Sequence, residues 1–179
     1  MELLKIISRA SGGEEYVDNA TNYLLDDRCC MRQGYGVSVN NADSAAMQFK
    51  QTAKFWNNQN KNPFIQAILS FSPETAPTAE TAMTLTDEII QPLTEEHLAM
   101  SVAHNEVRSG SSYHTHTMIS TTNYNDGTML YPDNSNNYAL AQRTADVTGQ
   151  PVTLVVENDK KEEWTCPHVF YPQSDEDDD

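Results

Sequence analysis

The chain has 179 residues, enough for one domain with a hydrophobic core, and a formal net charge of −15. Its apolar runs are too short for a membrane-spanning helix, and its N-terminus lacks the hydrophobic region and cleavage site of a signal peptide. We therefore expect no membrane insertion and a cytoplasmic location. Cys29, Cys30 and Cys166 form neither a disulfide framework nor a C-x-x-C zinc motif, so we expect reduced thiols.

The acidic charge is concentrated in the later part of the chain. Residues 1–61 contain seven basic and seven acidic residues, whereas residues 62–179 contain four basic and nineteen acidic residues. The overall charge argues against a nucleic-acid partner, and any polyanion would have to approach the N-terminal third. Five acids close the chain at 175–179. We therefore expect residues 1–171 to form one domain and residues 172–179 to form a disordered acidic tail.

The first half of the chain shows alternating strand and helix patterns. The apolar runs Glu2–Ser8 and Phe64–Phe71 predict strands, the second of them central. The clearest helix is Asp43–Asn57, because its apolar residues recur at helical spacing and Asp43 or Ser44 can cap it. The other segments are predicted as a helix Glu14–Leu25, a polar connection Asp26–Gln33 and a short strand Tyr35–Val39.

The second half predicts two helices around a strand hairpin, followed by a last strand. The helices are Thr78–Gln91 and Ser135–Thr148, and the last strand is Val152–Glu157. Between the helices, the runs Leu98–His104 and Tyr113–Ser120 flank a Ser/Gly loop and predict a hairpin. This order of elements predicts an α+β fold, with a single, largely antiparallel sheet and helices packed on it.

The hairpin carries three of the five histidines. Side chains alternate along a strand, so His114 and His116 should project to the same face. A turn near Ser109 or Gly110 would place His104 beside them. Three neutral imidazoles on one face predict a metal site with positions left for water or substrate. A His-x-His pair also occurs by chance on strands. We expect the other two histidines, His97 and His168, to lie on the surface.

The residues alone leave two kinds of chemistry open at such a site. A metal could activate water with Glu106 as the general base, although Glu106 could equally be a loop carboxylate in solvent. Alternatively, Tyr16 or Tyr23 from the first helix could act as a nucleophile, and spacing does not choose between them.

Several motifs resemble the relaxases, the mobilisation nucleases of plasmids and integrative elements. The segment His104-x-Glu106, followed after seven residues by His114-Thr-His116, resembles the three-histidine motif of these histidine–hydrophobic–histidine (HUH) endonucleases. Asn22-Tyr23-Leu24 is similar to the nucleophile motif of the family. The segments Tyr35–Val37, Ala45–Phe49 and Leu69–Glu74 are also similar to mobilisation proteins, so the resemblance covers roughly residues 1–157.

The resemblance implies an HUH-endonuclease (ferredoxin/RRM-like) fold and a metal-assisted transesterification. Tyr23 would attack a scissile phosphate in single-stranded DNA at a transfer origin, leaving a 5′-phosphotyrosine link for conjugative mobilisation. A divalent metal, Mg²⁺ or Mn²⁺, would sit on His104, His114 and His116, with Glu106 orienting a histidine or assisting the tyrosine proton. Accessory and coupling proteins of a relaxosome would be further partners. Candidate DNA-binding residues come from the least acidic region: Arg28, Arg32, Lys50 and Lys54.

The sequence departs from the family pattern in three ways. Thr115 stands between the paired histidines, Glu106 stands where an aspartate is usual, and the chain is acidic for a DNA-binding protein. Lys50 and Lys54 lie one helical turn apart and could simply form a solvated face. The alternatives are a catalytically weak DNA-binding or accessory module of the same fold, a metal hydrolase using Glu106 and water, and a rolling-circle replication initiator.

Overall fold

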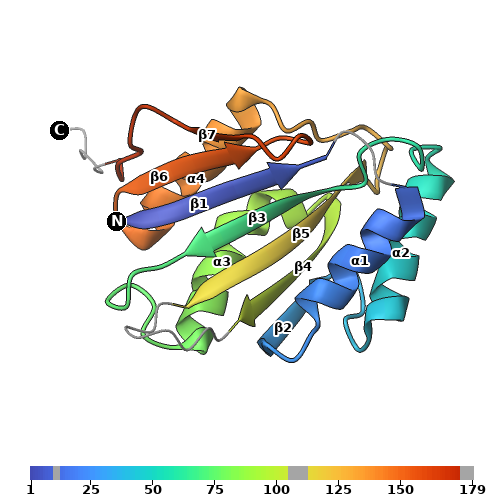
Figure 1. The fold of residues 1–179 in the computed structure, drawn as a ribbon, viewed down its shortest axis with the longest axis horizontal. Helices are drawn as coiled ribbons and strands as arrows, with labels where there is room; N and C mark the ends of the chain where they lie inside the picture. Colours follow the sequence, from blue (N-terminus) through green and yellow to red (C-terminus); the bar gives the residue numbers. More distant parts are fainter. Residues whose placement is uncertain (10–12, 105–112, 174–179) are drawn as a thin grey trace.

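The computed structural model describes residues 1–9, 13–104 and 113–173. These residues form one seven-stranded sheet in the order β2-β4-β5-β3-β1-β6-β7, with four helices (Figure 1). The strands are β1 (Glu2–Ser8), β2 (Cys29–Tyr35), β3 (Phe64–Ser70), β4 (His97–His104), β5 (His114–Asn123), β6 (Val152–Glu157) and β7 (Glu163–Thr165). The helices are α1 (Gly13–Leu24), α2 (Ala42–Phe55), α3 (Ala79–Thr94) and α4 (Asn134–Thr148).

The sheet is mostly antiparallel, as expected, and β3 is its middle strand. The neighbouring pairs within it are antiparallel except for β1 and β6, which run parallel. The parallel pair needs a long crossover, which α4 and the hairpin β4–β5 supply from the rest of the chain. The predicted α+β class with one sheet is therefore confirmed.

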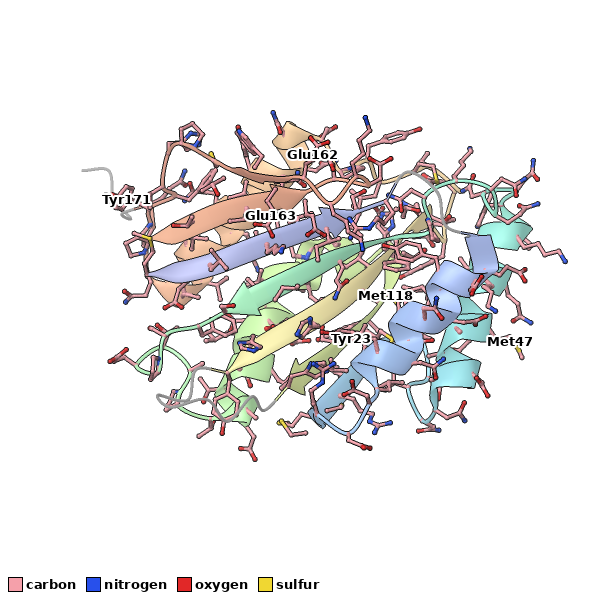
Figure 2. All side chains as sticks on the ribbon, viewed as in Figure 1. Tyr23, Met47, Met118, Glu162, Glu163 and Tyr171 are labelled. Atoms are coloured by element: carbon pink, nitrogen blue, oxygen red, sulfur yellow. The ribbon has the colours of Figure 1, made fainter. Side chains whose placement is uncertain are left out.

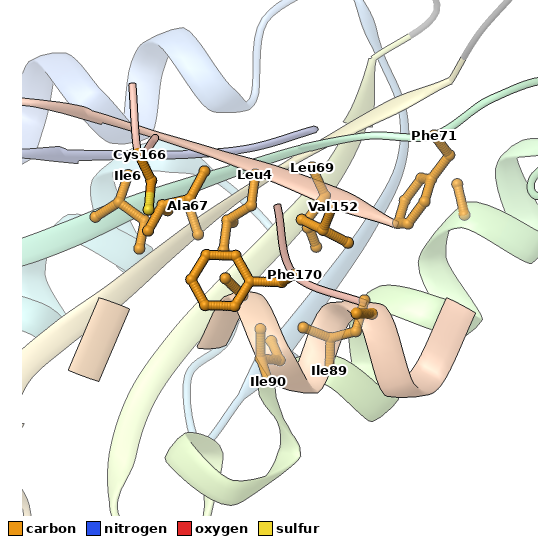
Figure 3. Close-up of a cluster of buried hydrophobic side chains, with 14 of the residues drawn as sticks. Leu4, Ile6, Ala67, Leu69, Phe71, Ile89, Ile90, Val152, Cys166 and Phe170 are labelled. Carbon is orange, nitrogen blue, oxygen red and sulfur yellow. The ribbon is translucent and has the colours of Figure 1, made fainter. Parts of the chain in front are cut away.

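The helices cover the two faces of the sheet unequally. In Figure 1, α3 and α4 lie behind the sheet, whereas α1 and α2 lie in front of only its β2–β4–β5 side. The rear core includes Leu4, Ile6 and Leu69 together with Ile89 and Ile90 from α3 (Figure 3). Among the described residues, no helix covers the front of β1, β6 and β7. One half of the front face is therefore an open sheet surface beside the two helices.

The front core is what fixes α1 on the sheet. Val17 and Leu24 of α1 are buried against Met100, Val102 and Met118 of the two hairpin strands. These positions follow the helical period in α1 and the two-residue period in the strands, so each element presents one apolar face. The last turn of α1 is thereby held directly above the ends of β4 and β5 that carry the histidines.

The polar segment after α1 was predicted wrongly. Residues 26–33 were expected as a connection and Tyr35–Val39 as a strand, but the strand is β2, paired with β4. The sequence CCMRQGY lacks apolar alternation because β2 is an edge strand that packs little on the core. The chain then turns at Gly36, whose φ of +71° favours glycine.

Helix α3 contains a proline, a residue that normally ends a helix. The helix was predicted to end at Gln91, yet it continues to Thr94 with Pro92 inside it. Pro92 has no N–H to donate to the carbonyl of Glu88, one turn earlier. The guanidinium of Arg143 on α4 donates to that carbonyl instead, at 2.8 and 3.2 Å. This contact replaces the missing helical hydrogen bond and joins α3 to α4.

Smaller differences follow from tertiary contacts. His97, expected on the surface, is buried at the start of β4, where Nδ1 lies 2.8 Å from the Ser120 carbonyl oxygen. Helix α2 is capped by Asn41 rather than Asp43 or Ser44. Strand β7 was not predicted, since three exposed residues carry no recognisable pattern. Residues from 174 onward lie outside the described residues, so the predicted acidic tail is not tested.

Candidate active site

The hairpin register brings the three predicted histidines to the front face of the sheet. His104, the last residue of β4, pairs with His114, the first residue of β5, and His116 pairs with Val102. Residues paired across two strands point to the same face, so all three imidazoles share one face. The ring centroids of His104 and His116 are 4.5 Å apart, and those of His114 and His116 are 6.1 Å apart. The predicted clustering on one face is therefore present.

The residue between the paired histidines points to the other face. Thr115 is fully buried, and its hydroxyl lies 2.7 Å from the hydroxyl of Thr86 on α3. A buried hydroxyl needs a hydrogen-bond partner, and Thr86 supplies it. This explains why a polar residue is accepted at a position that is usually apolar in this motif.

His104 has one ring nitrogen bonded and one unpaired. The side chain is fully buried, and Nε2 lies 3.1 Å from the backbone carbonyl oxygen of Leu24 at the end of α1. A carbonyl oxygen only accepts, so Nε2 carries the proton and Nδ1 carries a lone pair. Nδ1 is buried with no hydrogen-bond partner. A metal-binding histidine commonly donates its other N–H to a carbonyl in this way, so Nδ1 fits the donor atom of a metal ligand.

His116 has a neighbour that sequence reasoning missed. The side-chain amide of Gln66 on β3 lies 3.4 Å from His116 Nδ1. Gln66 pairs with Met118, so it shares the front face with the histidines. An amide can turn either its oxygen or its nitrogen toward the ring. If the oxygen accepts from Nδ1–H, Nε2 keeps its lone pair and can bind a metal, whereas an amide N–H donating to Nδ1 leaves the proton on Nε2. Pairing the predicted strand Phe64–Phe71 with the hairpin would have identified this polar position.

The three imidazole rings are clustered, but they are not oriented as ligands of one metal ion. Among the described residues, no group of three His, Cys, Asp or Glu side chains has the geometry to hold a metal ion. The planes of His114 and His116 are nearly perpendicular, at 79°. The residue types and the unpaired His104 Nδ1 fit a divalent metal, whereas the ring orientations would have to adjust on binding. Glu106 lies outside the described residues.

The end of α1 places one tyrosine beside the histidines. The ring of Tyr23 lies 6.0 Å from the rings of both His104 and His116, with its edge toward them, and 45% of the residue is exposed. Figure 2 shows Tyr23 beside the hairpin strands. Tyr16, two turns earlier, stacks on Phe64 at 4.4 Å, and burial raises its pKa. The structure thus separates two tyrosines that helical spacing alone leaves equivalent, and it places beside the histidines the one that the sequence motif favours.

Comparison with protein families identifies the family of this chain. A family model described as "Relaxase: MobA/VirD2-like, nuclease domain" matches residues 16–150. The chain belongs to this relaxase family. The match contains Tyr23 and all three histidines of the cluster. It also agrees with the HUH-endonuclease fold implied by the sequence motifs, and it identifies the chain as a DNA relaxase domain.

Two further comparisons add little detail. A solved structure described as the conjugative relaxase TrwC in complex with oriT DNA, in a metal-bound state, has 13% sequence identity to this relaxase domain. The TM-score is 0.41, and the match covers 91% of this chain and 75% of the TrwC chain. No curated protein matches the domain significantly. In the described part of the chain, no helix is both long enough and apolar enough to cross a membrane.

The four predicted DNA-binding cations lie in two places on the relaxase domain. Arg28 lies in the turn that follows α1, and Arg32 lies on β2, where it pairs with Val102 of β4. The guanidinium of Arg28 lies 4.6 Å from the centre of the Tyr23 ring. Arg32 is exposed and donates to the Val39 carbonyl at 3.1 Å.

Lys50 and Lys54 lie on α2, away from the histidines. They line a groove of about 480 Å³ between α1 and α2, together with Glu14, Asp18 and Asp43. Lys50 forms an ion pair with Asp18 at 2.8 Å. The lysines and arginines therefore do not form one continuous basic surface, and the groove is also lined by acids.

Proposed function

We propose that this domain nicks one DNA strand at the transfer origin of a plasmid or integrative element by tyrosine transesterification, in conjugative mobilisation. The observation that carries the proposal is the position of Tyr23, whose ring lies 6.0 Å from both His104 and His116. Membership of the MobA/VirD2-like relaxase family supports the same class of reaction. The partly buried ring of Tyr16, stacked on Phe64 at 4.4 Å, supports Tyr23 over Tyr16 as the nucleophile.

The reaction exchanges one phosphoester for another. The phenolic oxygen of Tyr23 forms a bond to the scissile phosphorus, and the bond from phosphorus to the 3′ oxygen breaks. The phenolic proton passes to water or to Glu106, and the leaving 3′ oxygen takes a proton from water. The products are a 5′-phosphotyrosine link and a free 3′ hydroxyl, so the energy of the phosphoester is retained for religation.

The histidine cluster supplies the electrostatic part of the proposal. His104, His114 and His116 would hold a divalent metal, Mg²⁺ or Mn²⁺, and such an ion neutralises charge on a bound phosphate. The Leu24 carbonyl fixes the proton of His104 on Nε2, so that Nδ1 is the donor atom. Because Leu24 follows Tyr23 directly, one turn of α1 positions both the nucleophile and a histidine.

The single strand would reach Tyr23 along the open half of the front face. Arg28 and Arg32 are the proposed phosphate contacts nearest the histidines, and Lys50 and Lys54 would contact DNA beyond α1. On the open half, Lys5 and Arg9 are already paired with Glu157, at 3.6 and 2.7 Å. This charge distribution supports weak binding by the domain alone, with relaxosome accessory and coupling proteins as further partners.

An adduct assay tests the proposal. The protein is incubated with Mn²⁺ and single-stranded oligonucleotides from its transfer origin, and an SDS-resistant protein–DNA adduct is measured. The adduct should disappear in Tyr23→Phe and in His114→Ala. It should persist in Tyr16→Phe, the matched control, because removing that hydroxyl leaves the ring stacked on Phe64.

The other outcomes separate the alternatives. Metal binding shown by calorimetry, with DNA bound but neither cut nor linked, would refute the nicking reaction and favour an accessory module. Cleavage without an adduct would favour a hydrolase that uses Glu106 and water. An adduct formed only on a replication-origin strand would indicate a rolling-circle initiator.

A further inference from the structure

Arg28 places its guanidinium directly on the ring of Tyr23. The central carbon of the guanidinium lies 4.6 Å from the ring centre, within the range of a cation–π contact. The two residues are five positions apart, joined by the turn that leads from α1 into β2. Arg28 is therefore tied to the candidate nucleophile by local chain geometry.

The orientation of Arg28 is also constrained by Asp26. Arg28 Nε and Nη2 donate to the Asp26 carboxylate at 3.1 and 2.7 Å, and the Arg28 backbone N–H donates to it at 2.9 Å. The Cys29 N–H closes the turn onto the Asp26 carbonyl at 3.0 Å. The Arg28 guanidinium lowers the pKa of Asp26, and Asp26 and then Tyr23 raise the pKa of Arg28. The guanidinium thus contacts both the Asp26 carboxylate and the Tyr23 ring.

We propose that Arg28 is the positioning residue of Tyr23: it holds the phenol ring against His104 and His116 and keeps a fixed positive charge beside the attacking oxygen. This inference rests on the proposed function of Tyr23. Tyr23 stands at the end of a helix and is 45% exposed, so its side chain could otherwise adopt other rotamers. A guanidinium stays protonated, so Arg28 orients and stabilises rather than transferring the proton.

The role differs from two simpler ones. If Arg28 were only a phosphate contact, its loss would weaken DNA binding and leave the reaction of bound DNA unchanged. If Arg28 were only a surface ion pair with Asp26, its loss would change little, because exposed ion pairs contribute weakly. Lysine should replace it only in part, because an ammonium can lie over an aromatic ring but lacks the two nitrogens that Arg28 uses to donate to the Asp26 carboxylate.

The experiment separates these roles by measuring binding and reaction independently. Adduct formation is followed in a single turnover at saturating origin oligonucleotide, and DNA affinity is measured by fluorescence anisotropy. Arg28→Ala should slow the saturated rate roughly 100-fold, the scale expected when a reacting group is misplaced by an ångström. Its DNA affinity should change much less than its rate. Arg28→Lys should recover only part of the rate.

Two further observations distinguish positioning from general damage. Added guanidinium, at concentrations that do not unfold the protein, should speed adduct formation in Arg28→Ala but not in Tyr23→Phe, with sodium chloride as the salt control. Arg143→Ala, an arginine removed from the rear face, should leave the rate unchanged. A parallel loss of affinity without loss of saturated rate, or no effect of Arg28→Ala at all, would overturn the proposal.

If the wild-type protein forms no adduct, the proposed nicking by Tyr23 fails. A second measurement then still tests whether Arg28 positions the Tyr23 ring. In the Mg²⁺-loaded protein with labelled tyrosine, nuclear Overhauser contacts between the Tyr23 and His116 rings should be present. Arg28→Ala should lose them and Arg143→Ala should keep them. If Arg28→Ala retains them unchanged, Arg28 does not position Tyr23.

Discussion

Gln66 should control how well His116 binds a metal. Its amide lies 3.4 Å from His116 Nδ1, and if the amide oxygen accepts from Nδ1, the lone pair of Nε2 is left for the metal. Partners of this kind change metal affinity by roughly 10- to 100-fold. The contact is longer than an ordinary hydrogen bond and Gln66 is half-buried, so we expect the lower end of this range.

The perturbation is Gln66→Met, which keeps the shape of the side chain and removes both amide groups. We expect Mn²⁺ affinity to fall about 10-fold, equivalent to about 1.4 kcal/mol. Gln66→Glu should bind more tightly than the wild type, because a carboxylate can only accept from Nδ1–H and adds negative charge. Affinity is measured by calorimetry, with the thermal midpoint as a check on folding.

The control for this prediction is Gln142→Met, a matched change of a half-buried glutamine on α4 that should leave Mn²⁺ affinity unaltered. If Gln66→Met binds Mn²⁺ as tightly as the wild type, Gln66 does not orient the His116 ring. Weaker binding by Gln66→Glu would show that Nδ1 accepts rather than donates, so that His116 would have to bind through that nitrogen.

Two further predictions concern the scaffold. Arg143→Met should lower the free energy of unfolding by about 1 kcal/mol, because it removes the donors to the Glu88 carbonyl. This loss should vanish in a Pro92→Ala background, where a backbone N–H again donates to that carbonyl. Additive losses of the two changes in urea denaturation would contradict the prediction. Burial lowers the pKa of His97 below its ordinary 6.5, so below that pH the unfolded chain binds more protons and stability falls as the pH drops. His97→Asn should remove this part of the acid sensitivity, measured as the difference between the urea midpoints at pH 7.5 and pH 5.5. If that difference is the same in His97→Asn as in the wild type, His97 is not its source.

The sequence was most informative where one pattern dominated. Strand β1 has the predicted ends, and the ends of α2 and β3 differ from the predicted ones by no more than two residues, because apolar residues recur there at one clear period. The shared face of His104, His114 and His116 also followed from local rules, since alternation and a hairpin are enough to produce it. These features depend on residues near one another in the chain.

Other features depend on which elements meet in space, and only the tertiary structure decided them. Helical spacing does not choose between Tyr16 and Tyr23, but the packing of α1 puts one on Phe64 and the other beside the histidines. Gln66 reaches His116 only because β3 pairs with β5. His97 is buried because β5 supplies the carbonyl for its ring. In each case the deciding partner lies 23 or more residues away, where no periodic pattern carries information.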